Sequence, residues 1–432
     1  MKGKLKLLAA AAAAMAGALG AAPASAQGQG IEFSGYLRTG TGSSSEGGKQ
    51  VCFQAPGASA KYRLGNECDT YGELAFALPF GKSDGAWAKF NLMVAILEDN
   101  AASDFESTNG GDFDIASRQN YFQAGGFFGD GALRDAKIWI GKRYYNRHDV
   151  HINDYYYWSN SGLGAGIEDI ALGSSAKFAL AYHSKGNDDL RTDLLNGLNT
   201  RRLSARVYDI PLNPGGKIEF EAALLKGDSA GSPRDGKGSG GALFVEHMQT
   251  GILGGYNKLA LVLGKDAGMG GNWVPTYQDA TDRVEGSSWR VIEQIYVAPQ
   301  GSRWSGLATA VFEQIKPDGG NKAKWYSFGI RPQYQFTDHF SLAFELGHDR
   351  TELEGSPDAT LTKFTVAPQL ALGPGFWNRP VFRAFATYAK WNSGYEARSD
   401  DPSTASVERP VGGVFGSKRH GMTYGVQVEA WW

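Results

Sequence analysis

The sequence predicts an all-β protein that crosses a membrane as a closed antiparallel β-barrel. Three observations support this fold class: an N-terminal export signal, many rows of alternating apolar and polar residues, and connections of two distinct lengths. Beyond the signal, no apolar run approaches the roughly 18 residues that indicate a membrane-spanning helix. Because lipid offers no partner to open backbone groups, a chain without such helices spans a bilayer only as a closed barrel.

Residues 1–26 are expected to be a secretory signal that is cleaved, leaving residues 27–432 as the barrel. Lys2, Lys4 and Lys6 precede an apolar run, and Ala24-Ser25-Ala26 supplies the small residues of a cleavage site. An uncleaved anchor is the alternative, but the apolar run is short and rich in alanine. Cleavage removes three of the 43 basic residues and leaves 40 against 45 acidic ones. Nothing in this balance suggests nucleic-acid binding.

Strands are indicated by apolar side chains at every second position. Ile31, Phe33 and Leu37 alternate with polar residues, the pattern of a strand between lipid and water. A soluble β-sandwich would alternate as well, so the pattern alone does not decide. Further apolar rows of this kind are Leu74, Phe76 and Leu78; Phe90, Leu92, Val94 and Ile96; Ile218, Phe220 and Leu224; Leu259, Leu261 and Leu263; Tyr326, Phe328 and Ile330; Phe340, Leu342, Phe344 and Leu346; and Met422, Tyr424, Val426 and Val428.

The connections between these rows differ systematically in length. Short polar turns at 213–216 and 337–339 contrast with long stretches rich in Gly, Ser and Asp. Outer-membrane barrels have short periplasmic turns and long external loops, so the bacterial outer membrane, with its lipid around the barrel, is the expected location. The long stretches lie near 43–68, 99–115, 226–240, 264–287 and 393–420.

Cys52 and Cys68 are the only two cysteines of the chain. Export makes a disulfide between them the expected state, and we expect it to close a surface loop rather than to organise a core. The alternative, a pair of metal ligands, lacks further cysteines.

The segment Gly141–Trp158 crowds arginines, aspartates and aromatic rings together without helical periodicity. Guanidinium and carboxylate groups bond hydroxyls in fixed directions, and aromatic faces cover the C–H surface of a ring, so the segment suits a sugar. His148 and His151 raise the alternative of metal or acid–base chemistry, but in an extended strand they point to opposite faces. No metal, cofactor or enzyme activity is expected, because no nucleophile–base–orienter set can be placed.

Long stretches of the chain, from about Ile31 to Trp432, resemble the maltoporins, the maltodextrin-specific sugar porins. The matching stretches include GYLRTGTG, WIGKRYYNRHDVHINDYYYWSNSGLGAG, GIRPQY, FWNRPVFRAFATYAKW and the terminal WW. The resemblance implies an 18-stranded barrel that forms a homotrimer, a third loop folded inward, and facilitated diffusion of maltose and maltodextrins. It also implies external loops that phage can reach. A porin for another sugar such as sucrose, or a general porin, is the rival interpretation.

The resemblance further implies a line of aromatic rings that guides sugar chains along the lumen. For four of these rings, the alternation of the sequence independently predicts a position on the row opposite the lipid-facing residues. Alternation gives no prediction for Trp377, because this residue lies in a loop-like segment. Phe105 is matched to a ring that a neighbouring subunit contributes. The family has tryptophan where Phe105 stands and phenylalanine where Tyr256 stands. The implied rings are Tyr36, Tyr71, Phe105, Tyr256, Trp377 and Trp431.

A polar track that bonds the sugar hydroxyls is implied beside these rings. Four of its members lie in the Gly141–Trp158 segment, where Tyr156 matches the tyrosine of the family's constriction. The alternative is that facing arginines and acids only order water in the lumen. The implied members are Arg38, Arg63, Glu73, Arg118, Arg147, Asp149, Asp154 and Tyr156.

Overall fold

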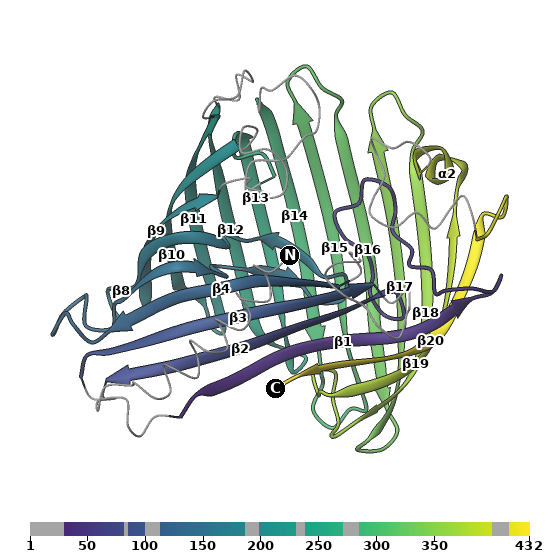
Figure 1. The fold of residues 1–432 in the computed structure, drawn as a ribbon, viewed down its shortest axis with the longest axis horizontal. Helices are drawn as coiled ribbons and strands as arrows, with labels where there is room; N and C mark the ends of the chain where they lie inside the picture. Colours follow the sequence, from purple (N-terminus) through teal and green to yellow (C-terminus); the bar gives the residue numbers. More distant parts are fainter. Residues whose placement is uncertain are drawn as a thin grey trace, which may run out of the picture.

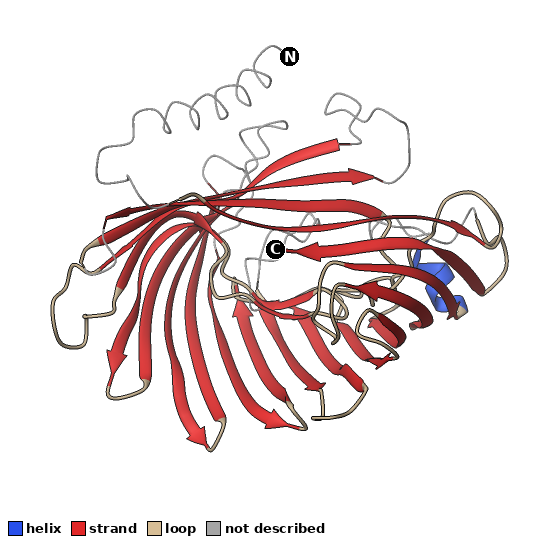
Figure 2. Cartoon of the chain, turned by 90° about the horizontal axis from the view of Figure 1, so that it is seen from below, coloured by secondary structure: helices blue, strands red, loops and turns tan. Residues whose placement is uncertain are grey.

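The computed structural model describes residues 30–81, 85–99, 113–185, 198–229, 238–270, 285–399 and 414–432. Their strands form one 18-stranded antiparallel sheet. The sheet closes because β1 (Glu32–Ser44) pairs both with β2 (Asp69–Gly81) and with β20 (His420–Trp431). Figures 1 and 2 show the strands following one another around this wall. The predicted fold class is therefore confirmed.

Each remaining barrel strand pairs with its neighbours in sequence. A two-stranded sheet, β6 (His148–Val150) and β7 (Tyr155–Trp158), and a short helix, α2 (Ser393–Ser399), lie outside the wall sheet. In the described ranges, no helix has the length and apolar character to cross a membrane. The other wall strands are β3 (Trp87–Asp99), β4 (Phe113–Gly125), β5 (Lys137–Arg143), β8 (Gly162–Leu172), β9 (Ala176–Lys185), β10 (Leu198–Asn213), β11 (Gly216–Ser229), β12 (Gly238–Ile252), β13 (Gly255–Asp266), β14 (Gly286–Val297), β15 (Trp304–Pro317), β16 (Ala323–Gln335), β17 (Phe340–Leu353), β18 (Ala359–Ala371) and β19 (Val381–Trp391).

The two faces of the wall follow the alternation of the sequence. On β11, Leu224 is 69% exposed on the outside, whereas the neighbouring inward side chains Ala223 and Leu225 are buried. On β19, Phe382 is exposed and Arg383 is buried. The outer face is thus apolar, as lipid requires, and polar groups are collected inside.

The two ends of the barrel differ in the length of their connections. Residues 214–215 and 253–254 form turns at one end, where Gly215 and Gly254 have φ of +76°, a conformation that such tight hairpin turns use. The opposite end carries the connections 45–68 and 144–161. We call the first end periplasmic and the second external, following the usual arrangement of outer-membrane barrels.

Two of the external connections fold into the barrel rather than away from it. The first connection, 45–68, lies against β16 and β17, where Tyr62 bonds Ser327 at 2.8 Å and Thr351 donates to the carbonyl of Pro56 at 2.6 Å. The third connection, 144–161, touches the first, because the backbone N–H of Arg63 donates to the carbonyl of Ile152 at 3.1 Å. Figure 2 shows tan segments inside the curve of the strands.

The disulfide between Cys52 and Cys68 is present, but the expectation that it closes a surface loop was wrong. Cys52 and Phe53 are buried, and Phe53 stacks on Phe415 and lies against Trp391 of the inner wall. The closed loop belongs to the main buried cluster of the molecule. Composition misled the prediction, because the Gly- and Ser-rich residues around the loop are typical of surface segments whereas its own apolar side chains pack inward.

Buried glutamates of the inner wall hold both inward connections. Removing a carboxylate from water is costly unless it is paired, and each of these glutamates accepts bonds from a connection. The first connection donates through the backbone N–H of Leu64 and the side chain of Arg63. The pairs are Trp158–Glu221 at 3.2 Å, Tyr157–Glu246 at 2.5 Å, Tyr155–Glu313 at 2.7 Å, Leu64–Glu345 at 3.1 Å and Arg63–Glu429 at 3.1 Å.

Candidate functional site

Three of the predicted rings lie where the first and last strands meet. Tyr36 on β1 is paired in register with Trp431 on β20. The ring of Tyr36 lies 6.3 Å from that of Tyr71 on β2. All three side chains are only half-buried, so part of each ring is open. Barrel closure therefore brings together residues from opposite ends of the chain.

A second group of rings lies nearer the periplasmic end. Trp377 stands in the connection between β18 and β19, and Tyr256 lies at the start of β13. Tyr296, near the end of β14, joins them: its ring is 5.6 Å from Tyr256 and 5.5 Å from Trp377. The sequence analysis missed Tyr296. Its place near a strand end, where aromatic residues are usually part of the membrane girdle, gave no distinguishing signal.

His151 connects the two groups. Its imidazole lies 6.0 Å from Trp431 and 5.0 Å from Trp377, so rings follow one another from Tyr71 to Tyr256. From the sequence, His151 was considered only for metal or acid–base chemistry, and its place on the aromatic line was missed. The Arg379 guanidinium also lies 4.2 Å from the centre of the Trp431 ring.

The predicted arginines of the first strand and first connection converge on one carboxylate of the third connection. Arg38 pairs with Asp154 at 3.3 Å and with Asp69 at 2.6 Å. Arg63 lies 3.9 Å from the same Asp154 and donates to the hydroxyl of Tyr36 at 2.5 Å. These polar groups thus lie directly beside rings of the aromatic line, with Arg63 bonded to Tyr36 and the Arg38 guanidinium 5.2 Å from the centre of the Tyr71 ring.

Arg147 is held between two aromatic rings. Its guanidinium carbon is 3.9 Å from the centre of the Tyr144 ring and 4.0 Å from that of Tyr156. Tyr156 is 38% exposed, while Tyr155 and Tyr157 on either side are buried against the wall. No ion pair is found for Arg147 within the described part of the chain, which leaves its N–H groups available in the lumen.

Glu73 and Arg118 face each other on β2 and β4. Their charged groups approach to 3.7 Å, and Glu73 accepts bonds from the hydroxyls of Tyr71 at 2.6 Å and Tyr144 at 2.5 Å. The Arg118 side chain also bonds Tyr144. Tyr144 was missed by the sequence analysis, although it precedes Arg147 by three residues in the segment singled out there.

Several titratable groups of the third connection have shifted pKa values, and His148 and Asp149 are the two that bear on its charge. Burial lowers the pKa of His148, but hydrogen bonds to Glu219 and Glu246 outweigh it and raise the pKa to about 9. Burial raises the pKa of the Asp149 carboxyl, and the nearby Asp154 adds to this effect. A cationic imidazole at neutral pH thus anchors the connection to the wall.

His148 and His151 lie in different parts of the site. His148 lies against β11 and β12 through Glu219 at 3.1 Å and Glu246 at 3.2 Å, whereas His151 lies on the aromatic line. Among the residues that the structure describes, no group of three or more His, Cys, Asp or Glu side chains is placed to hold a metal ion. Phe105, the remaining predicted ring, lies outside the described residues.

A closed outer-membrane barrel whose lumen is narrowed by inward connections and lined by rings and charges is a diffusion channel, not an enzyme. Comparison of the sequence with known protein families identifies its family: the LamB porin family matches residues 31–432. The chain therefore belongs to the LamB porin family.

Several solved structures match this chain at low sequence identity. OccAB1 of Acinetobacter baumannii has a TM-score of 0.52 at 10% identity, covering 95% of this chain and 99% of that one. OmpF of Salmonella typhi, in complex with daunomycin, has a TM-score of 0.47 at 11% identity, with 93% and 97% covered. OpdK of Pseudomonas aeruginosa has a TM-score of 0.45 at 10% identity, with 93% and 99% covered. At these identities the likeness to OccAB1 concerns the fold alone.

Proposed function

We propose that this channel conducts maltose and maltodextrins by facilitated diffusion. The observation that carries the proposal is the succession of rings from Tyr71 to Tyr256, each within about 6 Å of a neighbour or paired with it in register. A channel for small ions or for any small solute has no need of such a line. A channel for a chain of pyranose rings does need such a line, because each sugar ring presents an apolar face that can stack on an aromatic ring.

The mechanism follows from the two kinds of group in the lumen. A pyranose stacked on one ring gains roughly 0.5–1.5 kcal/mol, if values for aromatic pairs apply. Arg38, Arg147 and Asp154 exchange hydrogen bonds with the hydroxyls and so replace the water that the sugar leaves behind. Since successive rings are similar, the chain moves between weak sites of comparable strength, and no single site retains it. A curved line of this kind suits a helical α-linked glucan.

The assembly that we propose follows the family resemblance. Residues 1–26 direct export and are removed, and the mature chain forms a homotrimer in which Phe105 of one subunit extends the aromatic line of its neighbour. The preferred length of the sugar chain is then set partly by Phe105 and Tyr256, where the family has other rings. The external connections form the face that phage would meet.

Sugar-dependent block of ion current in a planar bilayer tests the proposal. We expect maltotriose to block the current saturably, and Trp431→Ala to weaken the apparent affinity about three- to tenfold, the effect of losing one stacked ring. Trp432→Ala is the matched control, because Trp432 is adjacent but 49% exposed on the outer face.

Comparison of maltose, maltotriose and sucrose separates the rival channels. Stronger block by sucrose than by maltotriose would assign the line to another sugar. Linear, unsaturable behaviour with all three would make the chain a general porin and reject a specific site.

A further inference from the structure

A pocket of about 710 Å³ lies at the periplasmic end of the barrel, apart from the aromatic line described above. It is lined by the starts of β3 and β5, the end of β4, and residues of the connection 126–136 between them, together with Asp169 on β8 and Lys177 on β9. Its volume falls in the range of small-molecule sites. Tyr256 is on β13 and Trp377 is in the connection between β18 and β19, and neither lines the pocket, so the pocket is not part of the line.

The pocket faces the lumen rather than the lipid. On β5, Lys137 and Trp139 share one face, and Trp139 is buried, while Ile138 and Ile140 are exposed on the other. On β9, Lys177 likewise alternates with Leu180 on the outer face. A molecule leaving the lumen on this side of the barrel therefore passes the pocket.

Trp87 gives the pocket an aromatic wall. It has the lumen-facing parity of Lys89, which pairs at 2.8 Å with Glu32 inside the barrel, so it is not a member of the lipid girdle. A side chain at Gly125 would lie within 3 Å of the Trp87 indole, which shows that the ring packs directly on the backbone there. The absence of a side chain at Gly125 thus leaves room for the indole in the pocket lining.

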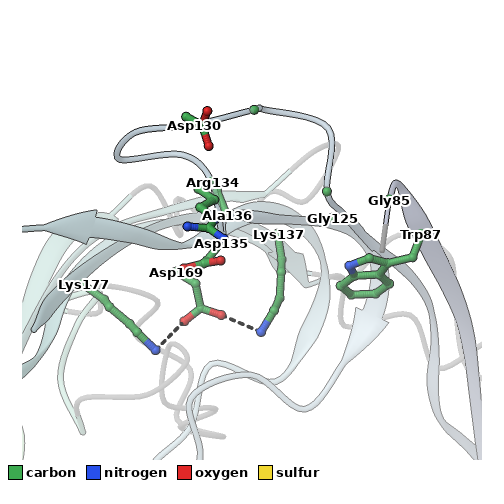
Figure 3. A pocket seen from close by; sticks show the side chains of 12 residues that line it. Gly85, Trp87, Gly125, Asp130, Arg134, Asp135, Ala136, Lys137, Asp169 and Lys177 are labelled. Atoms are coloured by element: carbon green, nitrogen blue, oxygen red, sulfur yellow. Dashed lines mark hydrogen bonds and ion pairs between the residues drawn. The ribbon is translucent and has the colours of Figure 1, made fainter. Parts of the chain in front are cut away.

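Polar groups with fixed positions stand beside this ring. The Asp169 carboxylate accepts bonds from Lys137 at 2.7 Å and from the hydroxyl of Tyr208 at 2.7 Å, and it lies 3.4 Å from Lys177. Both lysine side chains remain about 40% exposed and have further N–H groups to donate. Figure 3 shows Lys137 between Asp169 and the Trp87 ring, and the segment carrying Asp130 and Arg134 above them.

We infer that this pocket is a second carbohydrate subsite, which holds a sugar ring on Trp87 at the periplasmic mouth of the channel. A flat ring beside lysines, an arginine and carboxylates is the combination that binds a hydroxylated ring. The inference rests on the proposed sugar transport. The subsite captures sugar that approaches from the periplasm and gives a sugar leaving the line a second place to bind before release.

Side-specific block measurements test the subsite. With channels inserted in one orientation, we expect Trp87→Ala to slow block by maltotriose added on the periplasmic side about three- to tenfold, and to change block from the external side less than twofold. Trp87→Phe keeps a ring and should restore most of the periplasmic rate. Gly125→Ala, which pushes the indole off the backbone, should resemble Trp87→Ala.

The control is Trp304→Ala, since Trp304 is exposed on the outer face near the same end of the barrel and packs on Tyr334. Its block kinetics should equal those of the wild type, and single-channel conductance verifies that each variant is folded. Saturable block by the wild type with no side-dependent change in Trp87→Ala would overturn the subsite and leave the proposed function intact. Absence of saturable block in the wild type itself would reject both.

Discussion

His148 is a charged anchor whose effect depends on pH. Its pKa of about 9, against an ordinary value of 6.5, reflects hydrogen bonds to Glu219 and Glu246 that outweigh burial. Because the folded pKa is raised, its stabilisation of the third connection is complete below about pH 6.5 and is lost as the pH rises through about 9. We expect brief closures and current noise of single channels to increase between pH 8 and about pH 10.

His148→Asn is the matched variant for this prediction. It cannot become a cation, so its channel should be noisier than the wild type at pH 7 and should show little further change near pH 9. Equal pH dependence in the two proteins would mean that other groups, and not His148, govern the motion of the connection.

At the scale of elements, the first connection is positioned by the fit of one ring against two glycines. Tyr62 is buried, and a side chain at Gly329 on β16 or Gly347 on β17 would collide with it. We expect Gly347→Ala to lower the free energy of unfolding by about 1–3 kcal/mol, the usual cost of overpacking, and to raise single-channel conductance as the connection moves. Thermal unfolding in detergent measures the first effect.

The double variant Gly347→Ala, Tyr62→Ala distinguishes this collision from a general effect on β17. Removing the ring removes the clash, so the double variant should be no less stable than Tyr62→Ala alone. A strictly additive loss of stability would show that the glycine acts through the strand backbone instead.

The sequence was most informative where strands impose a strict period of two. Alternation alone indicated that Tyr36 and Trp431 face away from lipid, and in the structure the two residues are paired in register at the seam. It did not indicate that the 45–68 loop folds inward, because that depends on contacts with β16 and β17, more than 250 residues away. Tyr296 gave no distinguishing signal near its strand end: it pairs in register with Tyr256 on the next strand, but its contact with Trp377 comes from a connection that follows β18.

At the scale of the whole molecule, stability is divided between two environments. The outer face gains from apolar side chains in lipid, and the inner face from buried carboxylates that bind the inward connections. The two faces tolerate charge differently, because the lumen supplies water and partners whereas the bilayer core supplies neither. The same substitution should therefore destabilise the outer face far more than the lumen face.

Leu261→Arg and Leu97→Arg test this difference. Leu261 is exposed near the middle of β13 on the outer face, and Leu97 is exposed on the face of β3 that it shares with Tyr71 in the lumen. We expect Leu261→Arg to lower the free energy of unfolding in liposomes by about 2–4 kcal/mol, the cost of arginine at the bilayer midplane, and Leu97→Arg to change it little. Urea unfolding followed by tryptophan fluorescence measures both. Equal losses would mean that the two faces tolerate charge alike and would contradict the difference assigned to them.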